Sequence, residues 1–86
     1  MLAKAEFINK TKTDAIRKAK YEVSPVKLHR NFDDSENDRQ IIYKTIYNFY
    51  EKFMSKLGID IDDIGDIYLD ALNEIRSFYA IDVNRA

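Results

Sequence analysis

The 86-residue sequence contains no cysteine and no tryptophan, and it has only one proline and two glycines. The lack of cysteine excludes disulfides, thiolate zinc sites, iron–sulfur clusters and cysteine nucleophiles. Small secreted domains often depend on disulfides, so we expect a reducing, cytoplasmic location. A small β-sandwich or barrel needs a turn about every 8–12 residues, which this little proline and glycine cannot supply. These absences favour a few long helices.

Long hydrophobic segments are also missing. No apolar run approaches the roughly 18 residues of a membrane span, and the segment MLAKAEFINKTKT lacks the continuous apolar region of a signal peptide. The sequence therefore predicts no membrane partner. Apolar residues still make up 45% of the chain and aromatic residues 13%, which is enough for a core. We expect one folded domain over residues 1–86.

The net charge of −1 conceals a strong asymmetry. Residues 1–30 carry eight Lys and Arg against three Asp and Glu, whereas residues 31–86 carry six against twelve. A basic arm that binds nucleic acid would produce this pattern, and so would attraction between the two halves of the chain. The candidate nucleic-acid contacts are Lys10, Lys12, Arg17, Lys18, Lys20, Lys27 and Arg30.

The clearest predicted helix runs from about residue 36 to residue 57. Ser35 is a favourable N-cap, and Glu36 and Asp38 lie in the first turn, where the helix dipole favours acidic side chains. Gly58 suits the position just beyond a helix C-terminus. Apolar residues recur at the helical spacing, and they are Ile42, Ile46, Phe49, Phe53 and Leu57.

A second helix is predicted over about residues 61–80, beginning in the aspartate-rich stretch GIDIDDIGDIYLD. An EF-hand calcium loop is the alternative interpretation of this stretch. In that loop Ile64 and Ala71 would occupy ligand positions 5 and 12, where oxygen ligands are required. Asp60 or Asp62 instead suits a helix N-cap. We therefore expect no metal site, and we expect an antiparallel helical hairpin over residues 35–81.

Residues 1–34 form a basic N-terminal segment. The sequence TDAIRKAKYEV predicts a helix from Thr13 that ends at Ser24-Pro25, because a residue before proline avoids the α conformation. LAKAEFI is compatible with a short helix or a strand, and NKTKT favours neither. VKLHRNFDD is predicted to be an extended connector whose apolar side chains pack on the hairpin, namely Val26, Leu28 and Phe32. The predicted fold is all-α, a small three-helix bundle.

A second apolar stripe lies on the helix predicted for residues 36–57, rotated by about 100° from the first. It consists of Tyr43, Tyr47, Tyr50 and Met54. Together the two stripes cover close to half of the helix, more than one neighbouring helix buries. Either the N-terminal segment covers the tyrosine side or a partner does. Because tyrosine and methionine are enriched in interface cores, we expect a protein interface here, with another protein or with a second copy in a homodimer.

Acidic residues form a separate stripe on the helix predicted for residues 61–80. They are spaced three or four residues apart, opposite the apolar face, and they are Asp63, Asp66, Asp70 and Glu74. Exposure of this helix surface to solvent is enough to explain the acidic ridge. The alternative, more specific interpretation is that the ridge binds a basic partner.

Reactive groups are scarce. His29 is the only histidine, whereas zinc sites without cysteine usually need two or three. No serine lies in a G-x-S-x-G context, and the phosphate-binding and dinucleotide-binding glycine motifs are absent. We therefore expect no enzymatic activity, no cofactor and no small-molecule substrate.

The sequence thus favours a small non-enzymatic binding or regulatory module: an inhibitor, an adaptor or a self-associating regulator. Nucleic-acid binding through the basic first 30 residues is the alternative. The composition, rich in Lys, Ile, Asn and Tyr, is compatible with small regulators from phages or mobile elements.

Overall fold

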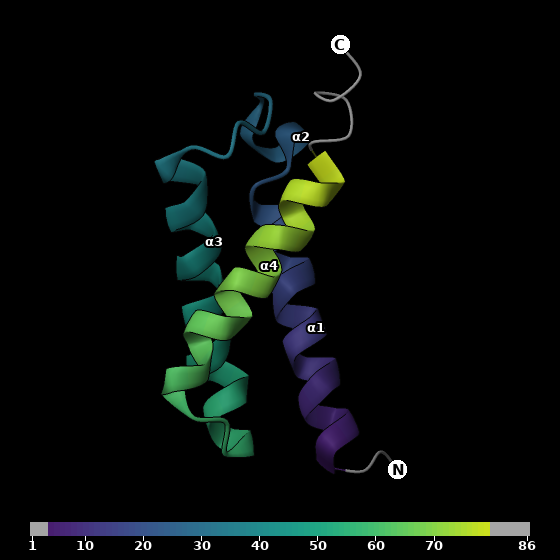
Figure 1. Cartoon of the computed structure of the whole chain (residues 1–86), viewed down its shortest axis with the longest axis vertical. Helices are drawn as coiled ribbons and strands as arrows, with labels where there is room; N and C mark the ends of the chain where they lie inside the picture. The colour runs from purple at the N-terminus through teal and green to yellow at the C-terminus, as the bar shows by residue number, and fades with distance from the viewer. Residues whose placement is uncertain (1–3, 80–86) are drawn as a thin grey trace.

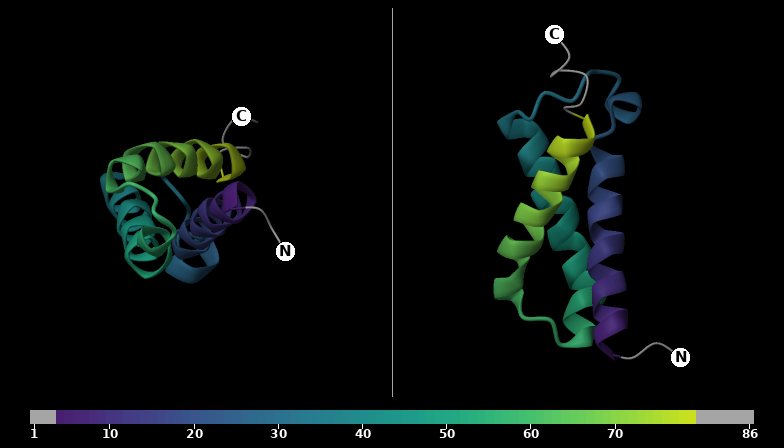
Figure 2. Two further views of the ribbon diagram at one scale, coloured as in Figure 1. Left: turned by 90° about the horizontal axis from the view of Figure 1, so that it is seen from below. Right: turned by 45° about the vertical axis from the view of Figure 1, so that its right-hand side comes forward.

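Three long helices make up most of the computed structural model, which describes residues 4–79 (Figure 1). Helix α1 spans Lys4–Glu22, α3 spans Glu36–Phe49 and α4 spans Ile64–Tyr79. Seen end-on, they stand at the corners of a triangle (Figure 2), and each contacts the other two. The predicted all-α three-helix bundle is confirmed.

Helix α1 is longer than the sequence indicates. It runs without a break through NKTKT, the segment that the sequence indicates is a poor former of both helix and strand. Thr11 is buried there, and its hydroxyl donates to the carbonyl oxygen of Phe7 at 2.9 Å, which offsets the cost of burying it. Ala15 and Ala19 are fully buried. Packing along the whole helix therefore outweighs weak local propensity.

The connector after α1 contains one helical turn, α2, spanning Pro25–Leu28. Ser24 caps it by accepting the backbone N–H of Val26 at 3.3 Å, and proline is well suited to the first position of a helix. The prediction of an extended connector was therefore wrong for this turn. Val26 is 83% exposed and anchors nothing, whereas Leu28 and Phe32 are half-buried.

The helical path from residue 36 to residue 57 is confirmed, but it is not a uniform α-helix. After α3, the backbone forms a π-helical turn over Tyr50–Met54 and a 3₁₀ turn over Ser55–Leu57. Ser35 caps α3 by accepting the N–H of Asp38 at 3.2 Å, as predicted. Gly58 ends the path with φ of +80°, a conformation that favours glycine.

The aspartate-rich stretch is a helix start, as predicted. Asp60 accepts the N–H of Asp62 at 3.0 Å and caps a 3₁₀ turn over Ile61–Asp63, which leads directly into α4. Helices α3 and α4 run antiparallel, which confirms the predicted hairpin (Figure 1). Its predicted end at residues 80–81 lies outside the described residues.

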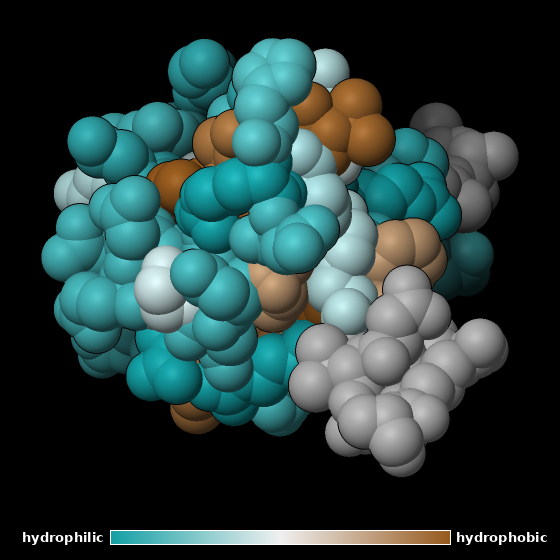
Figure 3. All heavy atoms as spheres, turned by 90° about the horizontal axis from the view of Figure 1, so that it is seen from above, coloured by the Kyte–Doolittle hydropathy of each residue, from teal (hydrophilic) through white to brown (hydrophobic). Residues whose placement is uncertain are grey.

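The core lies along the axis between the three long helices. It is made of apolar residues at most 7% exposed, which are Ala15, Ala19, Val23, Ile42, Ile46, Met54, Ile59, Ile64, Ile67, Ala71, Leu72 and Ile75. Viewed from the connector end, the visible surface is mainly hydrophilic (Figure 3). The connector thus closes this end of the bundle with polar groups.

Candidate functional site

The predicted interface stripe divides into an accessible half and a buried half. Tyr43 is 46% exposed, and Tyr47, one turn later on α3, is half-buried. The Tyr43 ring packs edge-on against Tyr68 of α4, with centroids 5.5 Å apart. This contact fixes the Tyr43 ring while leaving nearly half of the residue in solvent. Tyr43 and Tyr47 therefore present an ordered aromatic surface.

Tyr50 and Met54 lie on the inner side of the stripe. Met54 is fully buried in the core, so its predicted place on an accessible face was wrong. Tyr50 is half-buried, and its hydroxyl donates to the carbonyl oxygen of Ile59 at 2.9 Å. That hydrogen bond ties the end of α3 to the turn before α4. Tyr50 thus contributes to the hairpin itself.

The π-helical turn explains this division. A π turn uses one residue more than an α turn, so residues near its end are rotated by about 100° from the α-helical expectation. Met54 therefore turns into the core, and Phe53, which regular spacing places on the first apolar stripe with the buried Ile42 and Ile46, is 50% exposed. The sequence pattern carried no signal for this change of phase.

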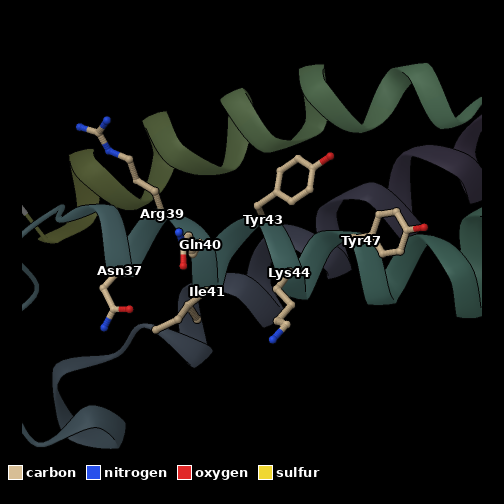
Figure 4. Close-up of a pocket in the computed structure, with 7 residues that line it drawn as sticks. All are labelled: Asn37, Arg39, Gln40, Ile41, Tyr43, Lys44 and Tyr47. Atoms are coloured by element: carbon tan, nitrogen blue, oxygen red, sulfur yellow. The ribbon is translucent and has the colours of Figure 1, made fainter.

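A shallow open groove of about 670 Å³ follows the outer face of α3. We call it the tyrosine groove; its lining residues are Asn37, Arg39, Gln40, Ile41, Tyr43, Lys44 and Tyr47. Arg39 and Tyr43 point toward α4, whereas Asn37, Ile41 and Lys44 point to the opposite side (Figure 4). Most of the lining is apolar, and it includes two cations and two amides.

An ion pair between the partly exposed Arg30 and the buried Asp38 holds the start of α3 in place. Asp38 is fully buried and accepts two bonds from the Arg30 guanidinium, one from Nη2 and one from Nη1 at 3.4 Å. The Asp33 N–H also donates to Asp38, at 3.2 Å. The hydrogen bond to Asp38 raises the pKa of Arg30 above its ordinary value. The connector is therefore tied to the first turn of the helix that carries the tyrosine groove.

Asp34 joins the connector to both helices of the hairpin. Its Oδ1 accepts Arg39 Nε at 3.2 Å, and its Oδ2 accepts Arg76 Nε of α4 at 2.6 Å. Partial burial acts to raise the pKa of Asp34, but the bonds to Arg76 and Arg39 outweigh it and hold that pKa below its ordinary value. The same carboxylate raises the pKa of Arg39. Arg39 is thereby positioned at the rim of the tyrosine groove.

The acidic ridge lies along α4 and the 3₁₀ turn before it. Asp66, Asp70 and Glu74 are exposed, and Asp63 is half-buried. Glu74 lies 4.0 Å from Lys20 of α1, an ion pair between the basic and acidic parts of the chain. Part of the charge asymmetry is thus satisfied within the fold. Binding of a basic partner by the acidic ridge remains a prediction.

Six of the seven predicted nucleic-acid contacts lie within 4.0 Å of a carboxylate. Lys10 and Arg17 both contact Asp14, and Lys18 and Lys27 both contact Glu22. The other two are Lys20, beside Glu74, and Arg30, which holds Asp38. Lys12 is half-buried. A nucleic-acid backbone would therefore compete with carboxylates already in place.

A second, smaller groove of about 270 Å³ lies between α1 and α3, and sequence reasoning missed it. Phe49 and Phe53 line it with rings 4.7 Å apart, beside Lys18, Glu22 and Lys52. Phe53 reaches this surface only because of the π turn. No sequence signal placed it there.

The hydroxyl groups of Ser24, Ser35 and Ser55 form hydrogen bonds with backbone groups. Ser24 and Ser35 cap helices, and Ser55 donates to the carbonyl oxygen of Glu51 at 3.2 Å. His29 is exposed and adopts a left-handed backbone at the end of α2. Within residues 4–79, no group of three or more histidine, aspartate or glutamate side chains could hold a metal ion. In the same part of the chain, no helix is long and apolar enough to cross a bilayer.

Comparisons with protein-family models, with curated proteins and with solved structures find no match to this chain.

Proposed function

We propose that this chain is a non-enzymatic binding module that engages another protein through the tyrosine groove of α3. The observation that carries the proposal is the ordered but half-exposed Tyr43, set in a largely apolar groove of about 670 Å³. Buried tyrosine rings contribute strongly to protein interfaces, because they add large contact area at a small cost in conformational entropy.

The rigidity of the groove supports the same proposal. The Tyr43 ring rests on Tyr68, and Arg39 is held by Asp34, so the groove needs little ordering when a partner binds. The start of α3 is itself tied down by the ion pair of Arg30 and Asp38. A surface arranged in advance binds more tightly than one that must be ordered on binding.

The test compares Tyr43→Asp with Tyr21→Asp in capture of a partner from the source cell, with far-UV circular dichroism to verify folding. Tyr21 is 60% exposed on α1, outside the groove, and is the matched control. We expect Tyr43→Asp to lose a partner that wild type and Tyr21→Asp both retain. Equal capture by all three proteins would refute the proposal.

Light scattering on the same proteins separates a foreign partner from a second copy. A homodimer formed through the groove would give twice the monomer mass for wild type and Tyr21→Asp, and the monomer mass for Tyr43→Asp. The proposal predicts a monomer mass for all three proteins. It also predicts that wild type and Tyr21→Asp capture the partner, whereas Tyr43→Asp does not.

A further inference from the structure

The charges around the tyrosine groove indicate what kind of partner it accepts. Of the seven lining residues, Arg39 and Lys44 are cationic and none is anionic. The carboxylates of α3 are Asp38, which is buried and paired with Arg30, and Glu36, which is exposed and directly precedes Asn37. Glu51 follows in the π-helical turn, about one turn beyond Tyr47, and is exposed. The lining of the groove therefore carries two positive charges and no negative charge.

Arg39 shares its carboxylate partner with a second arginine. Asp34 accepts hydrogen bonds from both Arg39 and Arg76, and the Glu36 carboxylate also attracts Arg39. Both arginines use Nε for Asp34. Within residues 4–79, the terminal nitrogens of these two guanidinium groups donate no hydrogen bond. Terminal guanidinium nitrogens are well suited to bind a carboxylate with two parallel bonds.

The spacing of these groups suits a helical ligand. Arg39 and Lys44 are five residues apart, a rise of about 7.5 Å along α3. Tyr43 and Tyr47 are four residues apart and form one ridge on the helix surface. An amphipathic helix laid along such a ridge places its apolar side chains on the tyrosines and its flanking side chains beside the charges.

We infer that the tyrosine groove binds an acidic amphipathic helix of another protein. The inference rests on the proposed function and specifies its partner. A bulky apolar side chain of this helix contacts Tyr43 and Tyr47, while carboxylates on its two flanks pair with Arg39 and Lys44.

A second copy of the chain fits the groove less well. Glu74 of its acidic ridge lies beside Lys20 of α1, whereas the groove lies on α3. A two-fold dimer would have to place the ridge of each copy in the groove of the other at the same time, because in such an interface residue i contacts residue j and j contacts i. A separate partner carries no such constraint.

The experiment is a selection from a displayed library of random peptides of about 20 residues, long enough to form a helix, against the wild-type protein. Selected peptides are synthesised with one tryptophan. Because the chain has no tryptophan, the peptide fluorescence alone reports binding. Affinities are then measured for wild type, Tyr43→Ala, Lys44→Glu and Lys52→Glu, each verified by circular dichroism. Lys52 is exposed and lines the smaller groove, so it is the matched control for Lys44.

We expect the selected peptides to combine glutamate or aspartate with a large apolar residue. Tyr43→Ala should weaken their binding by more than about tenfold, and Lys44→Glu by roughly three- to tenfold. Lys52→Glu should leave binding unchanged, and added salt should weaken it. Lys44 is exposed, so the charge test stands even if Tyr43→Ala does not fold.

Each other outcome is informative in its own way. Selected peptides without acidic residues, whose affinity falls for Tyr43→Ala but not for Lys44→Glu, would overturn the acidic partner and leave the proposed function intact. Peptides whose affinity is unchanged by Tyr43→Ala but altered by Lys52→Glu would place the binding site in the groove between α1 and α3. That result would overturn both the acidic partner and the proposed function. An empty selection, or rings and filaments of the wild-type chain in light scattering, would also overturn this inference.

Discussion

Replacing Tyr50 with phenylalanine tests the division of the second apolar stripe into accessible tyrosines, such as Tyr43, and Tyr50, which stabilises the hairpin. The change removes only the hydroxyl oxygen, which donates to the carbonyl of Ile59 at 2.9 Å. Ile59 is only 7% exposed, so its carbonyl has little access to water once that donor is gone. The loss should therefore exceed that of an exposed hydrogen bond.

The expected destabilisation is about 1–2 kcal/mol. A typical hydrogen bond contributes roughly 0.5–1.5 kcal/mol net, and leaving a buried acceptor without a donor costs about 1–3 kcal/mol. For a domain of this size, each 1 kcal/mol lowers Tm by about 4–8 °C. Urea unfolding followed by far-UV circular dichroism measures the loss as a lower midpoint at unchanged m-value.

Tyr43→Phe is the matched control. The Tyr43 hydroxyl makes no hydrogen bond within residues 4–79, so we expect a change in stability of less than about 0.5 kcal/mol. Tyr50→Phe should in turn bind the partner as wild type does. If Tyr50→Phe were as stable as wild type, or if Tyr43→Phe were equally destabilised, the proposed division into a structural and an accessible tyrosine would be wrong.

Three further predictions concern the turn, the connector and the basic residues. Gly58→Ala should lower stability by about 1 kcal/mol, because Gly58 has φ of +80°, whereas Gly65→Ala in the first turn of α4 should be neutral or slightly stabilising. An added Cβ meets no atom within 4 Å at either site, so the urea unfolding midpoints of the two variants compare the effect of backbone conformation alone. The pKa of Asp34 is held below its ordinary value of 3.8, so its contribution to stability is complete above about pH 5 and is lost as the pH falls through 3.8 and below. Asp34→Asn should therefore flatten the acid limb of a stability–pH curve, and an unchanged curve would contradict the bridge to Arg39 and Arg76. A salt series with duplex DNA and RNA should give no binding at physiological ionic strength, because six of the basic side chains already contact carboxylates; tight binding there would favour the nucleic-acid alternative.

Local signals in the sequence were sufficient to predict the hairpin. The Ser35 cap, the glycine at residue 58 and the aspartate cap at residue 60 each act within one turn of the chain, and each has the predicted role. Helix α1 was only partly predictable, because it continues through NKTKT, a segment of weak helical propensity in which Thr11 is buried.

The site was predictable only in part, for two physical reasons. The π turn shifts the phase of the helix, so Met54 and Phe53 exchange the surfaces that regular spacing assigns to them. Asp34, which binds Arg39, is itself held by Arg76, and Arg76 is 42 residues from Asp34 in the sequence. Spacing within one helix correctly placed Tyr43 and Tyr47 together, but it contains no information about such long-range partners.

The central claim is that Tyr43 and Tyr47 form the binding surface of this protein. The most direct measurement is ¹⁹F NMR of protein labelled with 3-fluorotyrosine, recorded with and without a saturating captured partner. Each of the six tyrosines gives one resonance, assigned by single substitutions to phenylalanine. We predict that the resonances of Tyr43 and Tyr47 shift while that of Tyr21 does not. A partner that shifts Tyr21 and leaves Tyr43 and Tyr47 unchanged would contradict the claim.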